Sequence, residues 1–426
     1  MGSLVLFGSF LFFMIINVPV AFALGLSSIF TLMYTHKMSI ETIARGLFST
    51  VDSFALLAVP LFIFAGLLME YGGLSRRLIN VAKVFVGSYT GGLASVTIVA
   101  CTFFAALSGS GPATVAAIGG IMIPAMVKAN YDVGFSSGVA ASAGTLGIII
   151  PPSIPLIIYG VITNTSITKL FIAGVIPGLI VAFSLLLVSY MIAKRRNYVG
   201  EKSDLTWKQK LAVINEAKLT LLMPVIILGG IYGGIFTPTE AAGVAVAYSA
   251  IIGIFVYKEI KWNQAFELFK RVTFICGTVL IIVGTASTYG RLLILEKIPD
   301  NVAKFLLSVT DQGWIILVFI LIFLIIVGMF METLSAIILL APIFVPVVTH
   351  YGIDPIHFGI IMILASEIGF LTPPVGDNLN VACAITGQSL EQVSKATLPF
   401  TITLIVLLFI VAFIPMLSMY LPKLIG

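Results

Sequence analysis

Two stretches, GTLGIIIPPSIPLIIYG at residues 144–160 and EIGFLTPPVGDNLNVAC at 367–383, each place a Pro-Pro pair inside an apolar run. Proline has no backbone N–H, and its ring clashes with the preceding helical turn. Pro151-Pro152 and Pro373-Pro374 therefore each predict a membrane helix that is broken in its middle. The alternative is that each pair only kinks a bundle helix.

The two stretches belong to a longer internal repeat. Prolines coincide at an offset of 222 residues, which pairs Pro124 with Pro346, Pro151 with Pro373, Pro152 with Pro374 and Pro177 with Pro399. Because proline marks positions where the backbone needs a break, four coincidences indicate a duplication. We predict a first repeat over 1–193 and a second over 219–426, joined by a basic linker at 194–218.

The composition indicates a membrane protein. Hydrophobic residues make up 59% of the 426 residues and charged residues only 10%, whereas soluble domains carry about 25% charged residues. Apolar runs of 18 residues or more recur along the chain, and they predict spanning helices rather than barrel strands. We expect a lipid bilayer as one partner and no nucleic acid, because surplus Lys and Arg in such a chain report orientation.

Each repeat is predicted to carry the same elements in the same order. The first has scaffold helices within 3–72 (3–17, 19–34 and 51–72), an amphipathic arm at 73–90, a hairpin at 91–128, a broken helix at 133–163 and a helix at 165–193. The second has scaffold helices within 219–292 (219–236, 238–257 and 272–292), an arm at 293–312, a hairpin at 313–349, a broken helix at 356–385 and a helix at 395–422.

The hairpins are predicted from the length of their arms. The runs 91–107 and 112–128 are each about 25 Å long as helices, short of a ~30 Å membrane core. The Ser108–Pro112 segment between them cannot continue a helix, so we expect a re-entrant hairpin. The first repeat then crosses the membrane an odd number of times, and the second must be inverted.

The predicted fold class is therefore an all-α polytopic membrane protein with two inverted-topology repeats, each with a re-entrant hairpin and a broken helix; the family resemblance given below implies that this architecture is of the elevator type. Inverted repeats with paired broken elements indicate a transport site near the middle of the membrane. The linker at 194–218 holds seven basic and three acidic residues, so we expect it in the cytoplasm.

Several side chains near the predicted breaks could take part in transport. Glu332 is the only acid in the apolar run from 314 to 348, and an intramembrane acid suggests function. It could also face water in a cavity without binding a ligand. Glu367 and Asp377 flank the second Pro-Pro pair and are candidate ion ligands.

The sequence argues against an enzyme. His36, His350 and His357 are predicted in loops, they form no metal-binding pattern, and no P-loop or nucleotide motif is present. A membrane serine hydrolase built on Ser110 would need a histidine within an apolar segment. It remains a remote alternative, and we expect an ion gradient to supply the energy.

Four stretches together resemble a known family, the large membrane subunit (DctM/SiaM type) of the tripartite ATP-independent periplasmic (TRAP) transporters. They are AALSGSGPATVAAIGGIMIPAM at 105–126, the stretch at 144–160, GMFMETLSAIILLAPIFVPV at 328–347 and the stretch at 367–383. The resemblance covers essentially the whole chain. It leaves open the sialic acid branch, which we favour, and the C4-dicarboxylate branch.

The resemblance implies Na⁺-coupled uptake of a small organic acid by an elevator mechanism in the bacterial inner membrane. It also implies a small four-helix membrane subunit (Q-type) and a periplasmic substrate-binding protein as partners. The nearest alternative is a stand-alone Na⁺/dicarboxylate symporter. Those symporters carry Ser-Asn-Thr at both hairpin tips, whereas these tips contain SGSGP and METLS.

The resemblance also suggests site residues. For substrate we expect Ser108, Ser110, Pro152, Ser153, Glu332 and Pro374. The sodium candidates are Ser108, Ser110, Gly144, Thr145, Gly147, Thr333, Gly369, Thr372 and Asp377. Na⁺ is the expected coupling ion, with no organic cofactor.

Overall fold

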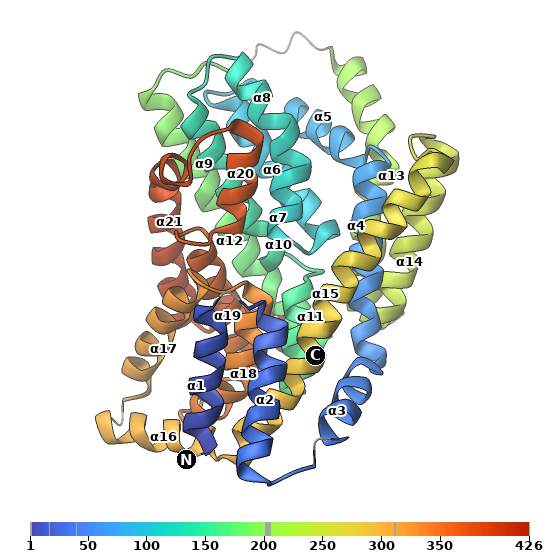
Figure 1. The fold of residues 1–426 in the computed structure, drawn as a ribbon. Coiled ribbons are helices and arrows are strands. Elements are labelled where there is room, and N and C mark those ends of the chain that lie inside the picture. The colour runs from blue at the N-terminus through green and yellow to red at the C-terminus, as the bar shows by residue number, and fades with distance from the viewer. Residues whose placement is uncertain (1, 17, 40, 201–205, 311, 426) are drawn as a thin grey trace.

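The computed structural model describes residues 2–16, 18–39, 41–200, 206–310 and 312–425, and within them every regular element is a helix (Figure 1). In this described part, nine helical segments are at least 18 residues long and apolar enough to cross a membrane. The predicted all-α, multi-helix architecture is confirmed.

The first repeat contains twelve α-helices in the described residues. They are α1 (Gly2–Ile15), α2 (Val20–Thr35), α3 (Glu41–Val51), α4 (Ala58–Tyr71), α5 (Leu74–Val86), α6 (Gly92–Ser108), α7 (Gly111–Thr114), α8 (Gly120–Lys128), α9 (Val133–Gly144), α10 (Leu146–Ile149), α11 (Ile154–Thr163) and α12 (Ile167–Arg195). A 3₁₀ turn at Phe54–Leu57 leads into α4, and a π turn at Val115–Gly119 joins α7 to α8.

The second repeat follows the same order. It consists of α13 (Trp207–Tyr232), α14 (Pro238–Ile251), α15 (Trp262–Leu295), α16 (Ile298–Val309), α17 (Gly313–Gly328), α18 (Thr333–His350), α19 (Pro355–Phe370), α20 (Asp377–Thr386), α21 (Leu390–Phe413) and α22 (Met416–Ile425). A π turn at Ile252–Val256 extends α14.

The two hairpins enter the molecule from opposite ends. Helices α6 and α8 descend from the top of Figure 1, where α5 lies, whereas α17 and α18 rise from the bottom, where α16 lies. The broken helices also run in opposite directions, α9 to α11 downward and α19 to α20 upward in the view of Figure 1. This arrangement agrees with the predicted inversion of the second repeat.

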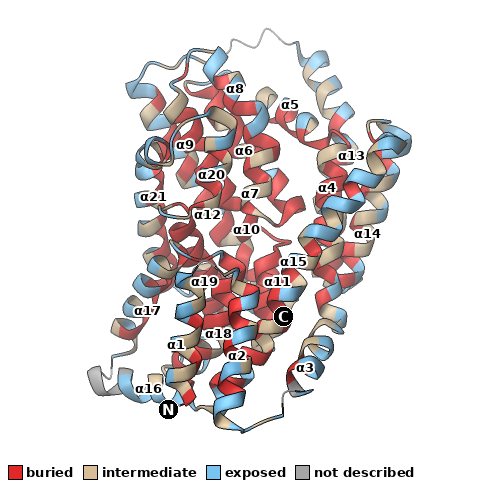
Figure 2. Cartoon of the chain, viewed as in Figure 1, coloured by how far each residue is buried: buried red, intermediate tan, exposed pale blue. Residues whose placement is uncertain are grey.

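The broken helices form the core, and the scaffold helices lie outside them (Figure 2). In the most apolar window of Val133–Thr163, 83% of residues are buried, compared with 22% in Trp207–Tyr232. Exposed residues on α13 and α15 include Val225, Phe274 and Ile281, and such apolar surface suits contact with lipid.

Several predicted boundaries were wrong. Helix α13 begins at Trp207, where Thr206 and Gln209 form a capping box, so the second half of the predicted linker is helical. Helix α3 was not predicted because it is only 11 residues long and amphipathic, so it does not form an apolar run long enough to cross a membrane. The predicted helix at 395–422 is two helices, since α21 ends before Pro415.

Three predictions lie partly outside the described residues: the end of the first helix at 17, the middle of the linker at 201–205, and position 311 of the second arm.

Candidate transport site

The first hairpin tip, Ser108–Pro112, reverses the chain between α6 and α7. Gly109 has a φ of +59°, a left-handed conformation that favours glycine. Ser110 caps α7, with its Oγ accepting the Ala113 N–H at 3.5 Å. The buried Ser108 hydroxyl lies 2.9 Å from the Thr114 hydroxyl, whose Oγ1 donates to the Ser110 carbonyl at 2.8 Å. The hydroxyl groups of the tip are therefore hydrogen-bonded to groups within the same hairpin.

The first tip packs on the first break, residues 145–153. The Ile154 N–H donates to the Gly109 carbonyl at 3.3 Å, which joins the tip to the start of α11. A Cβ added at Gly147 would lie 2.5 Å from the Ser110 carbonyl oxygen. Glycine at 147 is therefore required for the close approach of the two backbones.

The second tip, Met329–Thr333, packs on the second break, residues 371–376, in the same manner. The Val375 N–H donates to the Met329 carbonyl at 3.2 Å. A Cβ added at Gly369 would lie 2.4 Å from the Ile325 carbonyl oxygen. Gly147 and Gly369, which the 222-residue offset pairs, therefore play equivalent packing roles in the two repeats.

The two repeats meet at a buried polar group beside the first tip. Glu367 is fully buried in α19, its Oε1 accepts from Asn378 Nδ2 at 2.7 Å, and its Oε2 accepts from the Thr333 hydroxyl at 3.4 Å. Asn378 Oδ1 is buried and has no hydrogen-bond partner among the described residues. A Cβ on Gly111 would lie 3.0 Å from both Asn378 Oδ1 and Glu367 Oε1, and 3.2 Å from the Gly144 carbonyl oxygen.

These oxygens come from three separate segments. The first tip brings Gly111, the end of α9 brings Gly144, and α19 with α20 brings Glu367 and Asn378. Carbonyl and carboxylate oxygens at the ends of half-helices are the groups that bind Na⁺ in such folds. An orphaned buried amide oxygen otherwise costs free energy, so a cation there would satisfy it.

A cavity of about 150 Å³ lies between both hairpin tips and the scaffold. Its lining includes Ser108 and Ser110 from the first tip, Glu332 and Thr333 from the second, and Glu70 from α4. Ile275 and Val279 of α15 close the scaffold side. Glu332 begins α18 as an exposed residue whose carboxylate makes no capping bond, so it is available to a solute.

Other predicted site residues lie away from this cavity. Ser153 is buried and caps α11, accepting the Leu156 N–H at 3.4 Å, while Pro152 is buried beside it. Pro374 is exposed on the second break. None of the three belongs to the cavity lining.

The remaining sodium candidates lie at the two breaks. The Thr145 hydroxyl donates to the Ser142 carbonyl at 2.7 Å, and the Thr372 hydroxyl donates to the Ile368 carbonyl at 3.1 Å. Asp377 is the first residue of α20 and is half-buried. Thr145 and Thr372 thus use their hydroxyls within their own helices, leaving backbone oxygens as the groups available to an ion.

Sequence reasoning missed Glu70 and left Asn378 out of the candidate ligands. Glu70 lies at the end of the apolar run 51–72, and an acid within such a run could have been noticed. It lines the cavity and pairs with Arg271 of α15 at 3.5 Å. In the sequence only its position after the second break singles out Asn378. Its contacts with Glu367 of α19 and with Gly111 of the first tip form only in the folded chain.

The prediction for His357 was wrong. It lies inside α19, 2% exposed, with Nδ1 2.7 Å from the Ser418 hydroxyl and Nε2 3.2 Å from the Ala412 carbonyl. The ring therefore joins α19 to the junction between α21 and α22. Cys101 and Cys276 are buried free thiols, and Cys383 is a partly buried free thiol.

Comparisons with known proteins agree with this architecture. Residues 7–417 match the sequence profile of the family described as "Tripartite ATP-independent periplasmic transporter, DctM component". The chain is 44% identical over 416 residues to the isethionate TRAP transporter permease protein DctMQ of Oleidesulfovibrio alaskensis, covering 98% of this chain and 66% of that protein. The chain thus spans slightly less than two thirds of that relative.

Other relatives are similar over nearly their full length. The C4-dicarboxylate TRAP transporter large permease protein DctM of Pseudomonas aeruginosa is 43% identical, covering 95% of this chain and 94% of that protein. The sialic acid TRAP transporter large permease protein SiaM of Vibrio cholerae is 37% identical, covering 96% of this chain and 95% of that protein.

A solved structure shares the fold alone. The Alcanivorax borkumensis YdaH transporter, whose topology is described as unusual, superposes with a TM-score of 0.60 at 12% identity, covering 90% of this chain and 88% of that chain. The family match, the apolar helices and the inverted hairpins agree with one another. This multi-pass membrane protein belongs to the DctM family of TRAP transporters, as a large permease subunit.

Proposed function

We propose that this chain carries a small organic acid together with Na⁺ across the bacterial inner membrane, with the 194–218 linker on the cytoplasmic side. The observation that carries the proposal is the cavity bounded by both hairpin tips and by scaffold helices α4 and α15. Inverted-repeat transporters bind their solutes between broken elements of this kind. The relatives are named for isethionate, C4-dicarboxylates and sialic acid, which are all organic acids.

The charge of the cavity supports coupling to a cation. Glu332 lines it, as does Glu70, whose carboxylate pairs with Arg271, and no Lys, Arg or His is among its described lining residues. A carboxylate or sulfonate entering alone would meet like charge in a poorly solvated space. A cation bound at the same time offsets that repulsion, which is the physical basis of symport.

The oxygens around the first tip form the proposed Na⁺ site. Glu367 supplies a negative charge, and Asn378 Oδ1 and the Gly144 carbonyl supply neutral oxygens. Na⁺ is cargo here and would leave with the solute. Because Thr333 of the second tip also bonds Glu367, occupancy of this site would influence both tips.

The elevator motion is proposed from the pattern of contacts. The first tip is hydrogen-bonded to α11, and the second tip is hydrogen-bonded to the second break, so hairpins and broken helices form one body. The cavity lies where this body meets α4 and α15. Sliding at that boundary would expose the bound solute to either side while the tips keep their partners.

The proposed partners are a small four-helix membrane subunit and a periplasmic substrate-binding protein. The name DctMQ and the greater length of that relative support a membrane partner for this chain. The family name specifies a tripartite system with a periplasmic part.

Reconstitution tests the proposal. The full chain is placed in proteoliposomes, alone or with candidate small subunits and binding proteins, and uptake of radiolabelled isethionate, succinate and sialic acid is measured with and without an inward Na⁺ gradient. We expect uptake of one acid only with both partners and the gradient. Gradient-driven uptake by the chain alone would instead identify a stand-alone symporter, and uptake independent of Na⁺ would overturn the coupling.

A crosslinking experiment tests the elevator. Leu67 of α4 and Ala113 of α7 line opposite walls of the cavity and can be replaced by cysteine in a chain whose Cys101, Cys276 and Cys383 are changed to alanine. We expect the crosslinking rate to change when Na⁺ replaces choline. The same rate in both ions would count against a sodium-linked movement.

A further inference from the structure

A second cavity, of about 260 Å³, lies at the end of the molecule where α9 begins and α12 ends. Its lining consists of Phe135, Ile192, Arg195, Arg196, Lys395, Ala396 and Pro399, drawn from α9, α12 with its cap, and α21. This lining holds three cationic side chains and no acidic one. The cavity between the hairpin tips, the transport cavity, is instead lined by the acids Glu70 and Glu332.

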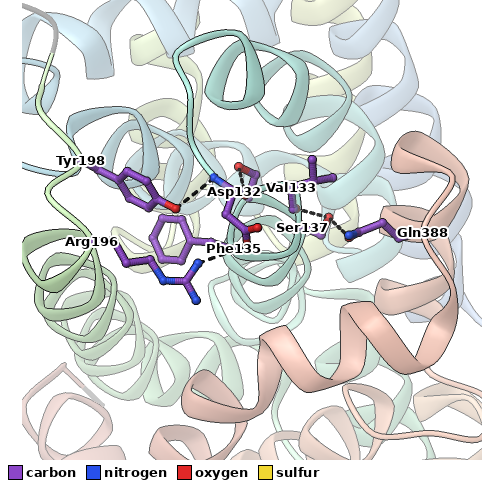
Figure 3. Close-up of polar contacts among 8 residues, drawn as sticks. Asp132, Val133, Phe135, Ser137, Arg196, Tyr198 and Gln388 are labelled. Atoms are coloured by element: carbon purple, nitrogen blue, oxygen red, sulfur yellow. Dashed lines mark hydrogen bonds and ion pairs between the residues drawn. The ribbon is translucent and has the colours of Figure 1, made fainter.

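Arg196 is held in place by its neighbours (Figure 3). Its guanidinium pairs with Asp132 at 3.1 Å and lies over the Phe135 ring at 5.8 Å. Tyr198 fixes this loop, because its hydroxyl oxygen accepts the Asp132 N–H at 3.0 Å and its ring stacks on Tyr131 at 4.3 Å. One wall of the cavity is therefore preorganised.

The other two cations remain available to an anion. Within the described chain Lys395 pairs with Glu391 alone, one helical turn away, and both side chains are about three-quarters exposed, so water weakens that pair. The Arg195 side chain makes no hydrogen bond or ion pair with any residue in the described part of the chain. Two exposed positive charges thus face a cavity that contains no counter-charge of its own.

Apolar stripes on two helices lead away from the cavity. Phe183, Leu187 and Met191 are exposed on α12 at four-residue spacing, and Arg195 continues that series. Leu398, Ile402 and Val406 form a similar exposed series on α21, next to Lys395. Residues three or four apart share a helix face, so each stripe and its cation lie on one exposed side of the helix.

We propose that this cavity binds the phosphate headgroup of an anionic phospholipid, with the acyl chains along the apolar stripes. Basic pockets between membrane helices are the recognised form of such sites. The stripes favour a phospholipid over a free phosphate ion, which would contact the cations alone. The bound lipid would fasten α12 to α21, the last long helices of the two repeats.

Native mass spectrometry of the full chain in detergent tests the proposal, with phosphatidylglycerol and phosphatidylcholine as probes. Arg195→Gln/Lys395→Gln should weaken phosphatidylglycerol binding roughly ten- to thirtyfold, because each Lys or Arg near an anionic lipid headgroup strengthens binding roughly fivefold. Phosphatidylcholine binding should not change. Lys194→Gln, which alters an exposed cation outside the cavity lining, should keep phosphatidylglycerol affinity within about twofold.

Two further measurements separate lipid recognition from other effects. Arg195→Lys/Lys395→Arg keeps both charges and should retain the binding that the neutral variant loses, and thermal unfolding without lipid should be alike for all variants. Equal phosphatidylglycerol affinity in the neutral double variant would overturn the proposal. Displacement of the lipid by millimolar inorganic phosphate would also overturn it, because the cavity would then be a site for a free ion.

Discussion

The two hairpin tips share one backbone plan and differ in chemistry. The first tip buries two hydroxyls that bond each other and their own backbone, and it leaves backbone oxygens beside Asn378. The second tip exposes the Glu332 carboxylate to the transport cavity. Duplication explains the shared plan, because in each hairpin a backbone oxygen at or just before the tip lies close to a glycine at or just before the facing break. The side chains were then free to diverge, and in the proposed function the first tip lies beside the ion site while the second faces the solute.

The largest effect is expected from Asn378→Leu. It removes the orphaned Oδ1 and leaves the buried Glu367 carboxyl group without its 2.7 Å donor, and a buried acceptor left without its partner costs about 3 kcal/mol when it is charged. Thermal unfolding should show that loss, and the Na⁺ concentration for half-maximal uptake should rise at least about tenfold, equivalent to ~1.4 kcal/mol.

Asn380→Leu is the matched control, since Asn380 is exposed on the same helix, donates to the Val375 carbonyl at 2.6 Å and bonds Asp377 rather than Glu367. We expect it to cost about 1 kcal/mol and to leave the Na⁺ dependence unchanged. Equal Na⁺ dependence in both variants would remove Asn378 from the proposed ion site.

The second effect concerns the two glycines that the repeats share. Gly147→Ala and Gly369→Ala each place a methyl group within 2.5 Å of a backbone oxygen, so each should cost about 1–3 kcal/mol of unfolding free energy and slow uptake. Gly120→Ala, on α8 with nothing within 4 Å, should be neutral or slightly stabilising. A large cost at one glycine only would mean that the two tips are not packed equivalently.

The third effect separates function from packing at the second tip. Glu332→Gln removes a charge that makes no capping bond, so unfolding should change by less than about 0.5 kcal/mol. Uptake should fall about tenfold because the carboxylate no longer contributes to the field in the cavity. Glu332→Asp keeps the charge and should recover much of the rate, and a glutamine variant with wild-type kinetics and Na⁺ dependence would exclude a role for the carboxylate.

The smallest effect is expected at the first tip. Ser110→Ala removes a long, weak cap and a cavity hydroxyl, so it should cost about 0.5–1 kcal/mol and slow uptake a few-fold. Ser166→Ala removes a similar cap, of 3.3 Å, at the start of α12 outside the cavity. It should lower stability to the same extent without changing uptake, and equal uptake in both variants would assign the first tip to backbone groups alone.

The breaks, the tips and the repeat could be predicted because their causes are local. A Pro-Pro pair ends a helix wherever it stands, and Ser110 between two glycines cannot continue α6. Helix α3 and the start of α13 were not predicted because a short amphipathic helix is stable only when it packs against neighbouring elements, which the local sequence does not show. His357 was placed in a loop because its buried partner, Ser418, is 61 residues away.

The sequence by itself determined the membrane class, the order of elements, the inversion and the family resemblance, since hydropathy, prolines and glycines act within a few residues. Only the tertiary structure decided that Ser153 caps a helix while Glu70 lines the cavity, and that Asn378 and Glu367 meet Gly111 and Gly144. Those four residues lie on segments up to 267 residues apart in the chain. Their convergence depends on how two inverted halves pack, which no local pattern specifies.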